Sequence, residues 1–253
     1  MTTIPLQTSI HGTGPGILLA HGGGGSIESN FGTVIPALAA GHTVVAPDYP
    51  GDDTPLTLDG LADALVAAAV DAGVETFTIV GFSLGTAVAV RAAARHPERV
   101  TGLLLTAGLA APDNRARLAV QAWQDLLDRG EHESFARLVL LTGFSTDFVN
   151  SLPAAAVDEM VRQTADSIPG GTSQQAALIE TVDTTADLAT LTVPTLVVAT
   201  TADLLVDPAN SRALAAGIPG AEYAEIEAGH VVMAERLDEW EKLLTGFLDR
   251  HRL

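Results

Sequence analysis

One serine of this chain stands between two glycines, in the stretch 81–85 (GFSLG). A β-branched apolar run precedes it, and an alanine-rich helical pattern follows it. A serine at a sharp strand-to-helix turn has its hydroxyl exposed above the sheet, at the positive end of the helix dipole. We therefore expect Ser83 to be a nucleophile. A plain turn in a glycine-rich chain is the less favoured interpretation.

A near match to this motif occurs at 143–147 (GFSTD). It has the same Gly-Phe-Ser start, but it lacks the second glycine and no strand pattern precedes it. Without a strand-to-helix turn its serine has no comparable exposure. We expect no catalytic role for this second serine.

A serine hydroxyl needs a base, and the base needs a carboxylate that orients it. His230 follows the last strand-like run, 221–227, and is the expected base. The expected acid is Asp203, which comes directly after the run 193–201. Asp207 is the alternative, although its place before a proline also suits a helix cap. The other histidines that we considered are expected to be structural or solvated: His11, His42, His96, His132 and His251.

The oxyanion that develops during attack on a carbonyl needs two aimed N–H donors. One is expected from the backbone of Leu84 and the other from the loop 21–26 (HGGGGS), where Gly23 is the favoured donor. A phosphate-binding loop is the alternative for these glycines. The chain lacks the Lys-Ser/Thr ending and the spacing that such loops use.

Short apolar runs alternate with amphipathic helical patterns, which is typical of a parallel α/β sheet. The runs that we expect to be buried strands are 17–22, 42–48, 76–82, 100–108 and 193–201. Residues 111–188 show only helical patterns and interrupt this alternation. We therefore predict a core built from 1–110 and 189–253, with 111–188 as an inserted helical cap.

The cap is expected to shape the substrate pocket. Its aromatic residues Trp123, Phe144 and Phe148, together with Gly24 and Phe82, are the expected substrate contacts. For most of the cap aromatics, a place in the cap's own core is the favoured alternative. Five arginines are candidates for binding a substrate carboxylate, with a solvated surface as the favoured alternative: Arg115, Arg117, Arg129, Arg137 and Arg162.

The formal net charge of −18 argues against nucleic acid and anionic membranes as partners. No cysteine is present, so disulfides and thiolate chemistry are excluded. No apolar run is long enough to span a bilayer, and no secretory signal is apparent. We expect a cytoplasmic enzyme that acts on a small molecule and requires no metal or organic cofactor. Assembly as a homodimer is left open.

Five segments carry a resemblance to a known family: HGGGGS, GFSLGT, HPERVTGLLLTAG, VPTLVVATTAD and AGHVVMAE. Together they resemble the landmarks of the α/β-hydrolase superfamily, and within it small bacterial esterases and lactonases such as the oxoadipate enol-lactonases. The resemblance implies a mostly parallel eight-stranded sheet flanked by helices, an inserted helical cap, and a triad of Ser83, Asp203 and His230. Thr86 departs from the pattern, because a third elbow glycine is common there.

The function expected from these residues is hydrolysis of an ester, lactone or thioester of a largely apolar small molecule through an acyl-enzyme. The alternative is a non-hydrolytic reaction on the same scaffold, such as cyclisation, carbon–carbon bond cleavage or perhydrolysis. A ligand-binding protein with a silent triad is the least favoured hypothesis.

Overall fold

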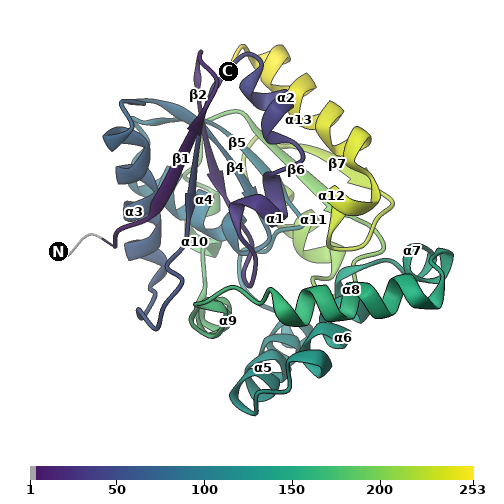
Figure 1. The fold of residues 1–253 in the computed structure, drawn as a ribbon. Coiled ribbons are helices and arrows are strands. Elements are labelled where there is room, and N and C mark those ends of the chain that lie inside the picture. Colours follow the sequence, from purple (N-terminus) through teal and green to yellow (C-terminus); the bar gives the residue numbers. More distant parts are fainter. Residues whose placement is uncertain (1–3) are drawn as a thin grey trace.

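The computed structural model describes residues 4–253, and its centre is one sheet in the order β1-β3-β2-β4-β5-β6-β7 (Figure 1). β1 is antiparallel to β3, and every other neighbouring pair is parallel. The described residues therefore form seven strands, where the family resemblance implied eight. The strands are β1 (Gln7–His11), β2 (Gly16–Ala20), β3 (Thr43–Asp48), β4 (Phe77–Phe82), β5 (Val100–Thr106), β6 (Thr195–Thr200) and β7 (Glu222–Ile226).

Helices cover both faces of this sheet (Figure 1). Residues of α3, α4 and α11 join the core on one face, and residues of α1, α2, α12 and α13 join the core on the other. Their bounds are α1 (Ile27–Phe31), α2 (Ile35–Ala39), α3 (Leu58–Asp71), α4 (Leu84–Arg95), α11 (Pro208–Gly217), α12 (Val232–Glu235) and α13 (Leu237–His251).

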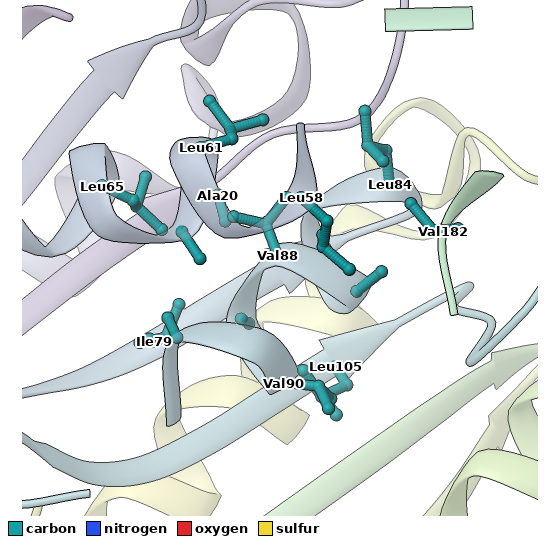
Figure 2. Close-up of a cluster of buried hydrophobic side chains, with 14 of the residues drawn as sticks. Ala20, Leu58, Leu61, Leu65, Ile79, Leu84, Val88, Val90, Leu105 and Val182 are labelled. Carbon is teal, nitrogen blue, oxygen red and sulfur yellow. The ribbon is translucent and has the colours of Figure 1, made fainter. Parts of the chain in front are cut away.

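The two cores follow from the alternation of side chains along buried parallel strands. In β2, Leu18 joins the α3/α4 core, whereas Ile17 and Leu19 join the opposite one. Figure 2 shows part of the first core, where Leu61 and Leu65 of α3 lie near Val88 of α4. This packing fixes the carboxyl ends of the strands, from which the loops of the site extend.

The remaining helices form the insertion after β5. Figure 1 shows α5, α6, α8 and α9 grouped along the lower edge of the molecule. Short α10 differs from the others, because it packs against α4 of the sheet body. The bounds are α5 (Asn114–Asp128), α6 (His132–Gly143), α7 (Thr146–Ser151), α8 (Ala154–Asp166), α9 (Thr172–Thr181) and α10 (Thr185–Leu188). The division into a core and a cap at 111–188 stays a prediction.

None of the helices in residues 4–253 is long and apolar enough to cross a membrane.

Candidate active site

Ser83 occupies the turn between β4 and α4 in a strained backbone conformation. Its φ of 53° and ψ of −121° lie outside the region that non-glycine residues ordinarily adopt. The flanking glycines are needed because a Cβ at Gly81 would lie 2.7 Å from the carbonyl oxygen of Gly85. A Cβ at Gly85 would lie 1.9 Å from the carbonyl oxygen of Ala20. The spacing of glycines around Ser83 is therefore a steric requirement of the turn.

Thr86 fits in this turn because Gly108, which follows the neighbouring strand β5, has no side chain. Its hydroxyl donates to the carbonyl oxygen of Ser83 at 2.7 Å and accepts from the N–H of Leu109 at 3.4 Å. A Cβ at Gly108 would lie 2.5 Å from the Thr86 hydroxyl oxygen. Thr86 thus ties the serine turn to the start of the insertion, and Gly108 leaves the room that this requires.

Ser83, His230 and Asp203 form one hydrogen-bonded chain. His230 Nε2 lies 2.9 Å from Ser83 Oγ, and His230 Nδ1 lies 2.7 Å from Asp203 Oδ2. An ionised carboxylate only accepts, so Nδ1–H donates to Asp203 and Nε2 is left to accept from the serine hydroxyl. All three residues are buried, with 5–7% of their surface exposed. The structure brings together the three residues predicted as a triad.

Asp203 is held by three further donors. Its Oδ1 accepts from the N–H groups of Leu205 and Val206, both at 2.8 Å, and its Oδ2 accepts from the Thr200 hydroxyl at 3.0 Å. Asp207, the alternative acid, instead caps α11 by accepting from the N–H of Ala209 at 2.8 Å. The geometry therefore favours Asp203 as the partner of the histidine.

Two backbone N–H groups beside Ser83 are available as oxyanion donors. Among the described residues, neither Gly23 nor Leu84 donates its N–H to a protein acceptor. The neighbours of Gly23 are occupied: Gly22 donates to Asn30 Oδ1 and Gly24 donates to Gln175 Oε1, both at 2.8 Å. The surrounding hydrogen bonds leave Gly23 as the free donor of this loop.

His21 opens the glycine loop and is fixed as a neutral side chain. Its Nε2 accepts from the N–H of Tyr49 at 2.9 Å, so its Nδ1–H donates to the carbonyl oxygen of Gly22 at 2.8 Å. Burial lowers the pKa of His21 from 6.5 to about 4, against smaller opposing effects of the Gly22 carbonyl and the Asp48 charge. A neutral imidazole therefore anchors the loop that carries Gly23.

The cavity at the triad has a volume of about 400 Å³. Ser83 and His230 lie in its wall, together with mostly apolar side chains of the insertion and a polar edge at Ser26, Glu28 and Asn30. The apolar lining includes Phe82, Trp123, Phe135, Val139, Phe144 and Ile168. This cavity suits a largely apolar small molecule.

The predicted substrate contacts divide into two groups. Gly24, Phe82, Trp123 and Phe144 line the cavity, but Phe148 does not. Phe148 stacks on Phe144 instead, with ring centroids 5.2 Å apart. None of the five candidate arginines lines the cavity: Arg115 donates to the carbonyl oxygen of Leu204, Arg137 and Arg162 pair with glutamates, and Arg117 and Arg129 are exposed.

The insertion contacts each loop of the site through a different helix. Gln175 of α9 holds the glycine loop at Gly24, as described above. Arg115 of α5 donates to the carbonyl oxygen of Leu204, next to Asp203, at 2.6 Å. At the end of α6, the carbonyl oxygen of Gly143 accepts from the N–H of Val231, next to His230, at 2.9 Å.

Several of these supporting residues were missed by the sequence analysis. Gln175 lies 151 positions from Gly24, and nothing in its local sequence marks it. Glu235 was also missed, although it lies five residues after His230 and accepts from the N–H of Gly229 at 3.2 Å. Its carboxylate additionally binds Ser145, the serine of the near-match motif, which caps α7.

Comparison with known proteins agrees with this geometry. The model of the α/β hydrolase fold family matches residues 15–237, and the chain belongs to this family. It is 36% identical over 247 residues to a pyrrolizixenacetamide deacetylase from Xenorhabdus hominickii, covering 94% of this chain and 92% of that protein.

Solved structures show the same fold. The enol-lactonase from Burkholderia xenovorans LB400 superposes with a TM-score of 0.85 at 24% identity, covering 96% of both chains. A thermophilic esterase from Thermogutta terrifontis gives a TM-score of 0.83 at 24% identity, covering 98% of this chain and 94% of that one. The chain is thus an α/β hydrolase with a Ser-His-Asp arrangement.

Proposed function

We propose that this protein hydrolyses an ester, lactone or thioester of a neutral, largely apolar small molecule through an acyl-enzyme on Ser83. The observation that carries the proposal is the continuous hydrogen-bonded chain Ser83–His230–Asp203 at the wall of a cavity. Two free N–H groups, those of Gly23 and Leu84, support it, because acyl transfer needs aimed donors for the oxyanion.

The reaction would proceed in two halves. His230 Nε2 takes the hydroxyl proton as Ser83 Oγ attacks the carbonyl carbon, and the resulting oxyanion accepts from Gly23 and Leu84. Collapse of the tetrahedral intermediate breaks the bond to the leaving group, which receives the proton from Nε2. Water then attacks the acyl-enzyme while His230 Nε2 takes one of its protons. Collapse of the second tetrahedral intermediate breaks the bond to Ser83 Oγ, which receives this proton from His230, and the acid is released.

The charge of the cavity favours a neutral substrate. Within residues 4–253, no lysine or arginine lines it, and Glu28 is the charged carboxylate at its edge. A substrate carboxylate would lose its hydration there without gaining a cationic partner. We therefore expect a neutral ester to react faster than an ester of equal length that ends in a carboxylate.

Amide hydrolysis is the second candidate. It is favoured by the 36% identity to a protein described as a deacetylase of an acetamide. The same residues suffice for it, because His230 can protonate a departing amine as it protonates an alcohol. Parallel assays on an acetate ester and on the matching acetamide distinguish the two substrates.

A fluorophosphonate probe and one variant test the proposal. The probe should label Ser83, as read by peptide mapping, and Ser83→Ala should lose labelling and lose turnover by roughly 10⁴-fold or more. The melting temperature should stay close to that of the parent protein, because the substitution removes no packing. Labelling at Ser145, or ordinary turnover by Ser83→Ala, would refute the proposal.

A further inference from the structure

Two cavities of very different size meet at Ser83. The first is the cavity of about 400 Å³ described above. The second has a volume of about 20 Å³ and lies between the serine turn and helices α5 and α9. Gly23, Ser83, Trp123 and Leu205 line both cavities. A substrate bonded to Ser83 therefore has two unequal spaces for its two substituents.

The position of His230 decides which substituent enters which space. His230 lines the large cavity and does not line the small one, whereas Leu84 lines only the small one. The leaving atom must receive its proton from His230 Nε2, so it departs on the side of the large cavity. The oxyanion points to the N–H groups of Gly23 and Leu84. The acyl substituent is left with the small cavity.

The small cavity admits little more than one methyl group. About 10–15 Å³ of such volume is enough for one water molecule, and a methyl group is of similar size. Its walls are tightly packed apolar side chains, because Leu84, Leu109, Val120 and Val206 are each at most 5% exposed. Longer acyl chains would have to displace this packing, which close-packed interiors resist.

We propose that the enzyme is selective for acetyl-sized acyl groups carried on bulky, apolar, neutral leaving groups. The small cavity is the acyl site, and the large cavity is the leaving-group site. This inference rests on the proposed function, in which Ser83 carries the acyl group. It specifies that the acyl half of the substrate is small. It also proposes that the aromatic side chains of the insertion contact the alcohol or amine half.

Two substrate series test the assignment on the unmodified protein. In p-nitrophenyl esters from acetate to hexanoate, kcat/KM should fall with acyl length, by roughly 10–100-fold over the series. In acetate esters of propanol, hexanol and 2-phenylethanol, kcat/KM should hold or rise with size. A hexanoate ester that reacts as fast as the acetate overturns the proposal.

A matched pair of variants tests which cavity binds the acyl half of the substrate and which binds the leaving group. Val120→Ala enlarges the small cavity, and Val139→Ala makes the same chemical change in the lining of the large cavity alone. Val120→Ala should raise the hexanoate-to-acetate ratio of kcat/KM by roughly tenfold or more, since both γ-methyl groups leave the wall of the small cavity. Val139→Ala should leave that ratio unchanged and should slow the acetates of the larger alcohols. A reversed pattern places the acyl group in the large cavity and overturns the proposal.

The outcomes separate this inference from the proposed function. If no ester in either series is hydrolysed and the fluorophosphonate leaves Ser83 unlabelled, both fail together. If Ser83 is labelled and long acyl chains are preferred, the proposed function stands and the assignment of the cavities is wrong. Thermal melting of both valine variants confirms that the comparison is made between folded proteins.

Discussion

The carboxylate of Glu235 binds both the backbone N–H and the hydroxyl of Ser145, at 2.8 and 2.6 Å. Glu235 ends the short helix after His230, and Ser145 begins α7 of the insertion. The two segments meet so closely that a Cβ on Gly229 would lie 2.4 Å from the backbone nitrogen of Ser145. Glu235 therefore joins the histidine loop to the part of the insertion that carries Phe144.

The first prediction concerns this junction. Glu235→Gln should lower kcat/KM roughly tenfold and the free energy of unfolding by about 1–2 kcal/mol, because one Ser145 donor loses its acceptor. Glu239→Gln, an exposed substitution on α13, is the control and should change neither quantity. Steady-state kinetics and urea unfolding measure both effects. Identical behaviour of the two variants would show that the junction does not position His230.

The second prediction distinguishes the two aspartates. Asp203→Asn should cost roughly 10³–10⁴-fold in kcat/KM, because an amide N–H₂ facing Nδ1 favours the wrong tautomer of His230. Asp207→Asn should change activity by less than about twofold, because asparagine caps a helix as well as aspartate does. Both variants can be measured in one ester assay. An equal loss of kcat/KM in the two variants would contradict the assignment of Asp203, and not Asp207, as the acid.

The third prediction is a dependence of stability on pH through His21. Its pKa is lowered to about 4 in the folded protein, against 6.5 for the free side chain. The unfolded chain therefore binds a proton below pH 6.5 that the folded protein does not take up. Stability should fall as the pH drops from 6.5 towards 4, by up to roughly 3 kcal/mol from this group.

The variant His21→Gln isolates that contribution. Glutamine can accept from Tyr49 and donate to the Gly22 carbonyl, but it does not titrate. Urea unfolding at pH 7.5 and pH 5 should show a smaller loss for His21→Gln than for the parent protein. His132→Gln, at an exposed position of α6, should keep the full loss. If the free energy of unfolding fell by the same amount between pH 7.5 and pH 5 in all three proteins, His21 would be excluded as the source of this pH dependence.

The fourth prediction concerns the hydroxyl of Tyr49, which is buried and has no hydrogen-bond partner among residues 4–253. Burial raises the pKa of this phenol well above its usual range. Tyr49→Phe should raise the free energy of unfolding by about 1 kcal/mol, because it removes an unsatisfied polar group and keeps the stacking on His21. Tyr223→Phe, at an exposed position, should have little effect. A destabilised Tyr49→Phe would indicate a bound water at the hydroxyl.

The sequence made the central strands and the nucleophile turn predictable for physical reasons. Strands buried on both faces form continuous apolar runs, and each of the five predicted runs overlaps a strand of the sheet. The turn at Ser83 needs glycines at fixed positions, so its pattern is local. β1 was not predicted, because this edge strand is polar except for Ile10 and therefore has little apolar signal.

The supporting contacts of the site could not be predicted from the sequence. Gln175 and Asn30 act through hydrogen bonds to glycine N–H groups, and amide side chains in helices carry no signal of such a partner. Ser145, the serine of the near-match motif, binds Glu235, and this bond depends on the folded chain. Phe148 was predicted to contact the substrate, but it stacks on Phe144 instead. This position depends on packing in the folded chain and not on the local sequence.

The attachment of the insertion to all three loops has a consequence for thermal behaviour. The loops of Gly24, Leu204 and Val231 each share a hydrogen bond with a different helix of the insertion, and Glu235 adds its bonds to Ser145. Such exposed or half-buried contacts open at lower free-energy cost than a sheet core, in sub-global unfolding events. Release of α5 or α9 would leave the sheet intact and the reacting groups misaligned. We therefore expect inactivation on heating to precede the melting of the β-sheet.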